Sequence, residues 1–184
     1  MNRLLAAAAH SFVIALAGFM LSPFAASAKD AVSARADIIN STGKKIGTAT
    51  LMETKSGVQI SLTANDLSPG AHGMHIHEKG SCEGPDFKSA GGHFNPDKRS
   101  HGFKNPQGHH AGDLNNITVG SDGTVKEKLV VRDVTLRPGA ENSLMQSGGT
   151  SLVIHEKADD EKSDPAGNSG GRIACGVIAS TAKR

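Results

Sequence analysis

The tripeptide His75-Ile76-His77 constrains the fold of this chain more than any other feature. Residues i and i+2 of a β-strand point to the same face of a sheet, so an extended segment would bring these two imidazoles together. More histidines and one aspartate follow in the sequence: His93, His101, His109, His110, Asp113 and His155. Imidazole is a good ligand for copper and zinc, and a nitrogen-rich set that ends in one carboxylate suits zinc. The set is larger than one ion needs, so the sequence predicts a two-metal site.

The first 28 residues have the features of a secretory signal peptide. Arg3 precedes an apolar run over residues 4–21, and Ala26-Ser27-Ala28 matches a cleavage site of small residues. A membrane-anchoring helix is the alternative, but no stop-transfer flank follows the run. We expect cleavage after residue 28, which leaves residues 29–184 as one domain.

The composition argues against nucleic acid and membrane surfaces as partners. The formal net charge of the whole chain is only +2, and it falls further when Arg3 is removed. The chain has no Trp and no Tyr, so we expect an aliphatic core. Asn116-Ile117-Thr118 matches the pattern of a glycosylation site, but such triplets are common by chance and carry no weight.

Cys82 and Cys175 both lie in the part that would be exported. An even pair in an oxidising compartment most simply forms one disulfide. Two buried free thiols are the alternative. A metal-binding role for the thiolates is less expected, because the histidines already supply enough ligands.

Alternation of apolar and polar residues predicts an all-β fold. The alternation has a period of two between residues 57 and 65 and again between 124 and 132, as in half-buried strands. We expect strands near residues 30–39, 45–53, 57–65, 71–78, 113–119, 124–132, 150–156 and 172–179. Short strands at this spacing, separated by glycine- and proline-containing turns, favour an antiparallel sandwich or barrel.

Two long segments show no regular period, at about 79–112 and 157–171. Long loops without secondary structure are usually functional in a compact domain. The first contains most of the histidines, and the second is rich in Asp, Lys and Gly. We therefore expect both loops to be functional.

Five motifs, in order, resemble those of the copper/zinc superoxide dismutases from about Val32 to the end of the chain. They are Gly70-Ala-His-Gly-Met-His-Ile-His77, Gly92-His-Phe-Asn-Pro96, His110-Ala-Gly-Asp113, His155-Glu-Lys-Ala-Asp-Asp160 and Gly171-Arg-Ile-Ala-Cys-Gly-Val-Ile178. The resemblance implies an eight-stranded antiparallel Greek-key barrel, related to immunoglobulin-like sandwiches, with two long functional loops. It also implies dismutation of superoxide to dioxygen and hydrogen peroxide by a copper centre that is bridged to zinc.

The resemblance further implies two ligand sets that share one residue. The family's copper ligands fall on His75, His77, His93 and His155. Its zinc ligands fall on His93, His101, His110 and Asp113. His93 would bind both metals through its two ring nitrogens as a bridging imidazolate.

Three more roles follow from the same resemblance. Arg172 matches the arginine beside the copper, and its planar, permanently charged guanidinium suits a small anion such as superoxide. Asp159 matches a carboxylate that orients one histidine of each metal set. Cys82 and Cys175 match the family disulfide. Bacterial members are exported to the periplasm, so that is the expected location, and the family leaves a monomer or a homodimer open.

Two further histidines, His72 and His109, are not expected to bind a metal. His72 matches a structural histidine, so we expect hydrogen bonds there rather than a metal. His109 adjoins His110, but the family's zinc histidine precedes the aspartate by three residues, which selects His110 and leaves His109 at the surface.

A copper-delivery protein without catalysis is disfavoured because every ligand position and Arg172 are present. A purely structural secreted domain is disfavoured by the number of histidines that fit the ligand pattern.

Overall fold

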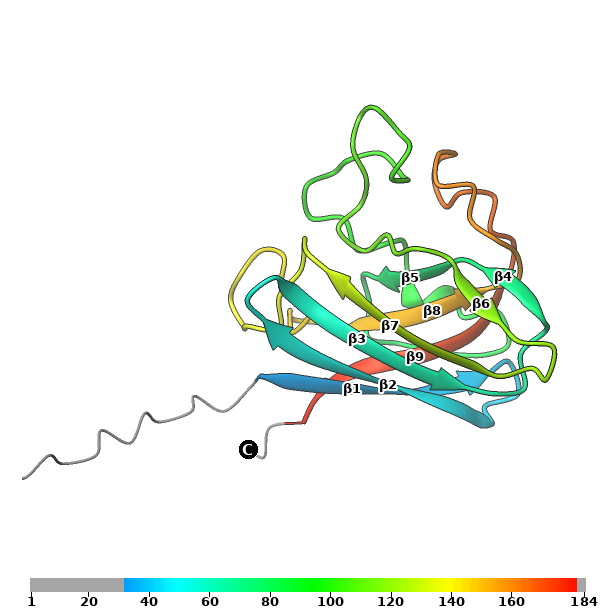
Figure 1. Ribbon diagram of the computed structural model, residues 1–184. Coiled ribbons are helices and arrows are strands. Elements are labelled where there is room, and N and C mark those ends of the chain that lie inside the picture. The colour runs from blue at the N-terminus through cyan, green and yellow to red at the C-terminus, as the bar shows by residue number, and fades with distance from the viewer. Residues whose placement is uncertain (1–31, 182–184) are drawn as a thin grey trace, which may run out of the picture.

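The computed structural model describes residues 32–181, so the predicted signal peptide at residues 1–28 lies outside the described residues (Figure 1). In the described part, no helix is long and apolar enough to cross a membrane. That part contains nine strands and one short 3-10 helix, η1 (Lys88–Ala90). The strands are β1 (Ser33–Asn40), β2 (Lys45–Thr54), β3 (Gly57–Ala64), β4 (Gly70–His72), β5 (Met74–His77), β6 (Ile117–Val119), β7 (Val125–Val131), β8 (Thr150–His155) and β9 (Arg172–Ser180).

Seven strands form one curled antiparallel sheet in the order β5-β8-β9-β1-β2-β3-β7 (Figure 1). β4 and β6 form a second, two-stranded sheet. β1, β2 and β3 are neighbours in both sequence and space, whereas the connection from β7 to β8 crosses from one edge of the sheet toward the other. This crossing is typical of Greek-key folds. The structure therefore confirms the predicted all-β antiparallel fold.

The single strand expected at residues 71–78 is divided into β4 and β5, which accounts for the ninth strand. β4 pairs with β6, whereas β5 pairs with β8, so the chain changes partners between them. At that point the N–H of Gly73 donates to the carbonyl of Lys157, and the carbonyl of Gly73 accepts from the N–H of His155, both at 2.8 Å. The break thus fixes the start of β5 to the end of β8.

The core is aliphatic, as expected. Every second side chain of β3 is buried: Val58, Ile60, Leu62 and Ala64. Phe94 belongs to this main core. Phe87 lies in a smaller cluster with Ala90, Val153 and Cys175. The smaller cluster gives the first long loop an apolar base on β8 and β9.

The two long loops project from the same side of the curled sheet (Figure 1). A disulfide joins Cys82 of the first loop to Cys175 of β9, with the two sulfurs 2.01 Å apart and a sequence separation of 93. The predicted disulfide is therefore confirmed. It fastens the first loop to the strand that begins with Arg172.

Candidate metal centre

Four histidines from distant parts of the chain meet in one buried group. His75 and His77 share a face of β5, as their spacing predicted, and His155 ends the neighbouring strand β8. His93 comes from the first long loop and forms an isolated bridge with His77. One ring nitrogen from each of the four lies within 4.8 Å of the others. We call these residues the four-histidine group.

The inward nitrogens of this group have no partner. Among the described residues, five buried side-chain polar atoms lack a hydrogen bond, and four of them belong to this group. The four atoms are His75 Nδ1, His77 Nε2, His93 Nε2 and His155 Nε2. Buried polar atoms are normally hydrogen-bonded. Four such nitrogens converging on one point are the arrangement that a metal ion would satisfy.

The opposite ring nitrogens hold these rings in place. His77 Nδ1 donates to the carbonyl of Gly91 at 3.0 Å, and His155 Nδ1 donates to the carbonyl of Gly170 at 3.3 Å. A carbonyl can only accept, so the proton of each ring is on Nδ1 and the lone pair is on the inward Nε2. Partners of this kind fix the orientation and tautomer of metal-binding histidines.

His93, His101, His110 and Asp113 form a second group, which we call the three-histidine-aspartate group. Asp113 Oδ1 lies 2.9 Å from His93 Nδ1, 3.0 Å from His101 Nδ1 and 3.3 Å from His110 Nδ1. The Nδ1 atoms of His93 and His110 are 3.2 Å apart. Ligands about 2.0–2.2 Å from a tetrahedral zinc ion lie about 3.3–3.6 Å from each other. The four atoms need only a slight expansion to reach that geometry.

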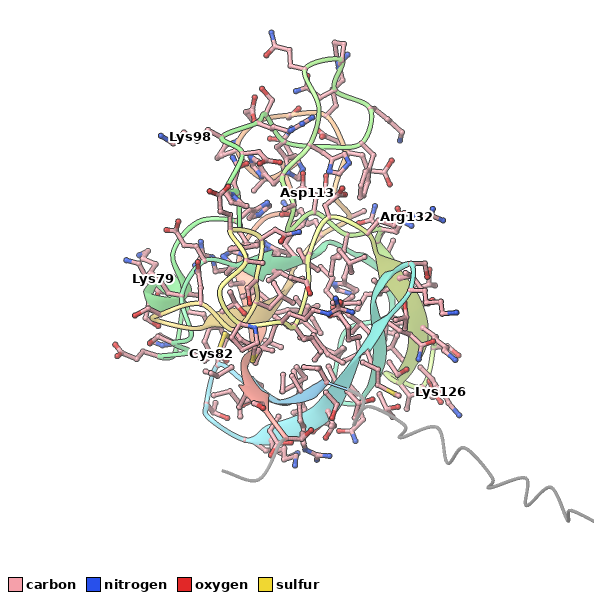
Figure 2. All side chains as sticks on the ribbon, turned by 90° about the vertical axis from the view of Figure 1, so that its left-hand side faces the viewer. Lys79, Cys82, Lys98, Asp113, Lys126 and Arg132 are labelled. Atoms are coloured by element: carbon pink, nitrogen blue, oxygen red, sulfur yellow. A yellow bond between two sulfur atoms is a disulfide. The ribbon has the colours of Figure 1, made fainter. Side chains whose placement is uncertain are left out.

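Asp113 is itself held by the backbone of the first long loop. Its Oδ2 accepts the N–H groups of Gly102 and His110, at 2.9 and 3.0 Å. Figure 2 shows Asp113 between the projecting loop and the curled sheet. The strand expected at 113–119 is confined to β6, and Asp113 pairs with His75 only in an isolated bridge.

Burial sets the charge of the four-histidine group. Desolvation lowers the pKa of His93 and of His155 to about 4, and holds the pKa of His77 well below its ordinary value. These imidazoles are neutral at pH 7, which is the form that binds metals. Burial alone would raise the pKa of Asp113, but hydrogen bonds from three histidines outweigh it and keep that pKa far below its usual range.

Asp159 connects the two groups. Its carboxylate accepts from His75 Nε2 at 2.6 Å and from His101 Nε2 at 3.0 Å. His101 therefore lies between the carboxylates of Asp159 and Asp113. Burial opposes a positive charge on His101, but these two carboxylates outweigh it and raise its pKa to about 9. A metal ion at Nδ1 would displace the proton held there.

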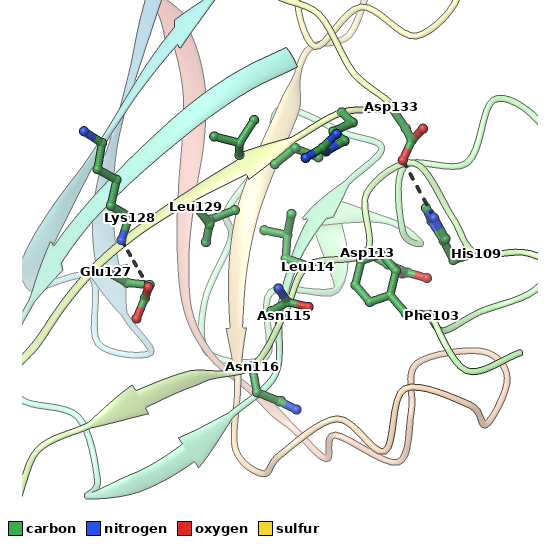
Figure 3. Close-up of a pocket in the computed structure, with 13 residues that line it drawn as sticks. Phe103, His109, Asp113, Leu114, Asn115, Asn116, Glu127, Lys128, Leu129 and Asp133 are labelled. Atoms are coloured by element: carbon green, nitrogen blue, oxygen red, sulfur yellow. Dashed lines mark hydrogen bonds and ion pairs between the residues drawn. The ribbon is translucent and has the colours of Figure 1, made fainter. Parts of the chain in front are cut away.

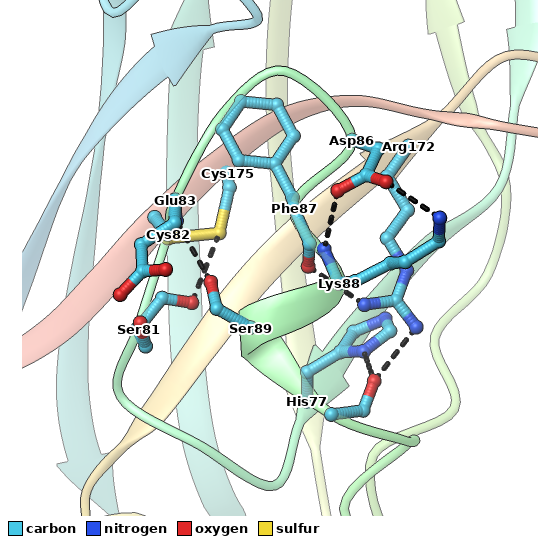
Figure 4. Close-up of a disulfide and its surroundings, with 11 residues drawn as sticks. His77, Ser81, Cys82, Glu83, Asp86, Phe87, Lys88, Ser89, Arg172 and Cys175 are labelled. Carbon is cyan, nitrogen blue, oxygen red and sulfur yellow. Dashed lines mark hydrogen bonds and ion pairs between the residues drawn. A yellow bond between two sulfur atoms is a disulfide. The ribbon is translucent and has the colours of Figure 1, made fainter.

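Arg172 lies beside the four-histidine group, at the start of β9 (Figure 4). Its Nη1 donates to the carbonyl of Phe87 at 2.8 Å, and its Nη2 donates to the carbonyl of Gly91 at 2.7 Å. The Gly91 carbonyl is the same one that accepts from His77. One carbonyl thus positions a candidate metal ligand and a candidate anion-binding group, while the charge of the guanidinium is not neutralised by it.

The two histidines set apart in the sequence are in neither group. His72 lies between two backbone carbonyls, with Nδ1 2.7 Å from the oxygen of His155 and Nε2 2.8 Å from the oxygen of Ser68. His109 lines a pocket of about 440 Å³ beside β7, together with Phe103 and Asp133 (Figure 3). It is half-buried rather than fully exposed.

Three residues that hold the site were missed from the sequence: Gly91, Gly112 and Asn116. The backbone of Gly112 accepts from the N–H of Ile76 and donates to the carbonyl of Phe94, each at 2.8 Å. A Cβ there would lie 2.3 Å from the carbonyl oxygen of Ile76. Gly112 stands between His110 and Asp113, so that motif was the signal available for it. The contacts of Gly91 and Asn116 reach residues too far away in sequence to leave such a signal.

The comparisons with known proteins agree with this geometry. Residues 45–178 match the model of the copper/zinc superoxide dismutase family. A copper/zinc superoxide dismutase of Aquifex aeolicus is 53% identical over 84% of this chain and 92% of its own length. The solved superoxide dismutase-like protein of Bacillus subtilis is 46% identical, covers 78% of this chain and 96% of its own, and has a TM-score of 0.76. For the solved enzyme of Brucella abortus the identity is 32%, the coverage 79% and 99%, and the TM-score 0.65.

Together with these relatives, a curled antiparallel sheet that carries two adjoining, nitrogen-rich groups able to hold metals indicates a two-metal oxidoreductase. The chain belongs to the copper/zinc superoxide dismutase family. Its function is the dismutation of superoxide, and its cofactors are copper and zinc.

Proposed function

We propose that the four-histidine group binds copper and that the three-histidine-aspartate group binds zinc. The observation that carries this assignment is the set of four buried, partnerless nitrogens of His75, His77, His93 and His155. An all-nitrogen set suits copper, whereas the group with a carboxylate suits zinc. The assignment matches the ligand sets expected from the sequence.

His93 is proposed to bridge the two metals. Its Nε2 belongs to the four-histidine group, and its Nδ1 lies 2.9 Å from Asp113 in the other group. The remaining ligands each direct one atom into one group. His93 is also the residue proposed to move a proton during turnover, at Nε2, because its Nδ1 faces the zinc group.

The chain's residues divide the work of catalysis between them. Copper, when bound, supplies the electron exchange with superoxide. Arg172 is proposed to attract the anion and orient it, because its guanidinium is held rigidly by two neutral carbonyls beside His77. Asp159 is proposed to keep His75 and His101 in their ligating orientation.

The assignment can be tested by crystallography of the metal-loaded protein with anomalous data at the copper and zinc edges. We expect a copper peak within the four-histidine group and a zinc peak within the three-histidine-aspartate group, with His93 between them. Interchanged peaks, or a single mixed site, would contradict the assignment.

We also propose that the chain is exported to the periplasm as a single domain of residues 29–184. The Cys82–Cys175 disulfide supports this, because such bonds persist in oxidising compartments. Mass spectrometry of the protein recovered from a periplasmic fraction should give a chain that begins at Lys29.

The proposed assembly is a monomer or a homodimer, and light scattering of the protein from the periplasmic fraction distinguishes the two.

A further inference from the structure

Asn116 makes a two-point contact that none of the assigned roles uses. Its side-chain Oδ1 accepts from the backbone N–H of Asp159 at 2.7 Å. Its Nδ2 donates to the backbone carbonyl of Asp159 at 2.9 Å. Both polar groups of one amide therefore hold both polar groups of one peptide residue. This fixes the position and the rotation of the Asp159 backbone.

The place of Asn116 in the chain gives this contact its consequence. Asn116 directly precedes β6 and lies three residues after Asp113. Asp159 lies on the second long loop, 43 residues further on. The amide thus joins the segment that carries one site carboxylate to the backbone of the other.

The two carboxylates must keep a set distance because they hold the same ring. Asp113 Oδ1 lies 3.0 Å from His101 Nδ1, and Asp159 Oδ1 lies 3.0 Å from His101 Nε2. The other oxygen of Asp159 holds His75 of the four-histidine group at 2.6 Å. A small displacement of Asp159 would therefore change the orientation of one ligand in each metal group.

Close packing around Asp159 leaves it little freedom in the native position. A Cβ added to Gly167 would lie 1.7 Å from Asp159 Oδ1. The same oxygen accepts the N–H of Glu161 at 2.6 Å. The close approach of Gly167 and the hydrogen bond from Glu161 confine the carboxylate from within its own loop, whereas Asn116 holds the Asp159 backbone from the segment that precedes β6.

We propose that Asn116 is a positioning residue that sets the metal affinity of the zinc group through Asp159. This inference rests on the proposed zinc site. A side chain that supports a ligand indirectly typically changes metal affinity by about 10–100-fold when it is removed. Asn116 acts through one more residue than Asp159 does, so we expect an effect near the lower end of that range.

The test is the zinc dissociation constant of the mature protein, measured by competition with a chelator. Asn116→Ala should weaken zinc binding about tenfold. Asn115→Ala is the matched control, because this neighbouring side chain is exposed and should leave the constant unchanged. When cobalt is loaded at the proposed zinc site, the visible spectrum reports the ligand geometry. This spectrum should differ from that of wild type in Asn116→Ala but not in Asn115→Ala.

A double-mutant cycle separates positioning from a general effect on folding. Asp159→Asn should weaken zinc binding at least as much as Asn116→Ala does. Adding Asn116→Ala to Asp159→Asn should cause no further loss of zinc affinity, because the carboxylate through which Asn116 acts is already absent. Equal losses from Asn116→Ala in both backgrounds, or an unchanged constant in the single variant, would overturn the proposal.

Two further arms keep the outcome decisive. If Asn116→Ala does not fold, Asn116→Ser retains a side-chain oxygen, and its zinc constant should lie between those of wild type and Asp159→Asn; a wild-type value would overturn the proposal. If Asp113→Ala left the zinc dissociation constant at its wild-type value, the proposed zinc site itself would be wrong.

Discussion

At the scale of single residues, the proposed metal preference of each group depends on which atoms its proposed ligands present. His155 contributes only its Nε2, and only to the four-histidine group. Asp113 contributes only to the other group, where its Oδ1 contacts three histidines. Only His93 belongs to both of these groups. Substitutions at His155 and Asp113 should therefore each reduce the binding of one metal and not the other.

His155→Ala should abolish superoxide dismutation and yet retain most of the zinc. Asp113→Ala should lose zinc first, because three histidine contacts and two backbone contacts depend on that carboxylate. Elemental analysis of both variants after dialysis, with an activity assay alongside, provides the measurement. If His155→Ala lost zinc and kept copper, the ligand assignment would be refuted.

Arg172→Ala should slow the reaction substantially without releasing either metal, because the guanidinium bonds only to carbonyls. Enzymes of this class work near the diffusional ceiling, where attraction of the anion controls the rate. Raising the ionic strength from about 0.01 to 0.15 M shortens the Debye length from about 30 to 8 Å. The wild-type rate should fall over that range, and the variant should respond less.

Pulse radiolysis at several salt concentrations measures both rates. Arg35→Ala is a matched control, because it removes the same charge from an exposed position on β1 that is paired with Asp37. Arg172→Glu should be slower than Arg172→Ala, since repulsion is added to the lost attraction. Equal salt dependence in wild type and Arg172→Ala would exclude Arg172 from guiding the substrate.

At the scale of elements, the loops depend on the strands beneath them. The first long loop is fastened to β9 by Cys82–Cys175 and by the two hydrogen bonds from Arg172. Figure 4 shows both connections on the same part of the loop. The loop in turn supplies the Gly91 carbonyl that orients His77.

Removing the disulfide with paired Cys82→Ser and Cys175→Ser substitutions should lower the free energy of unfolding by about 2–4 kcal/mol. Activity should fall as well, because the loop that positions Arg172 gains freedom. Zinc content should be largely retained, since the proposed zinc ligands, within residues 93–113, follow the stretch of the loop around Cys82 and Gly91 that is tied to β9. Denaturant unfolding with metal analysis checks this, and unchanged activity in the folded variant would count against the coupling.

The alternation of apolar and polar residues predicted most of the strands, but not the point at which the chain leaves one partner strand for another. The alternation at 57–65 and 124–132 identified β3 and β7 to within two residues. It could not reveal the break at Gly73, because that break arises from hydrogen bonds to Lys157 and His155, distant in sequence. Periodicity reports one face of a strand and carries no information about which strand lies beside it.

At the scale of the whole molecule, folding brings together imidazoles whose protonation opposes the native state. The pKa values of His93 and His155 are lowered to about 4, below the value of about 6.5 in an unfolded chain. The unfolded chain therefore binds more protons, and the stability from these residues, complete above pH 6.5, is lost as the pH falls toward 4. His101 has the opposite sign: its contribution is complete below pH 6.5 and is lost as the pH rises through about 9.

The metal-free protein should thus have a lower melting temperature at pH 4.5 than at pH 6.5, by roughly 5–10 °C. Calorimetry of the metal-free protein at the two pH values is the measurement. In His155→Ala the difference should be smaller, because one of the opposing imidazoles is absent. Equal melting temperatures at pH 4.5 and 6.5 in wild type would contradict the expectation.

The candidate site was largely predictable because its ligands stand in short motifs. His75 with His77, and His110 with Asp113, have spacings that carry chemical meaning on their own. The supporting contacts were not predictable in this way. Asn116 showed only a chance glycosylation pattern, since its role depends on a peptide group 43 residues away. Its partner is a backbone, which has no residue identity for a sequence to display.

The two metal groups also differ in how much of the chain they require. The three-histidine-aspartate group is complete within residues 93–113, whereas the four-histidine group needs β5 paired with β8 and ends at His155. In the order of the chain, every proposed zinc donor therefore precedes His155, the last proposed copper donor. Arg172 and Cys175 follow later still, on β9. The proposed copper site thus depends on the long-range pairing of β5 with β8, whereas the proposed zinc site draws on one continuous stretch of chain.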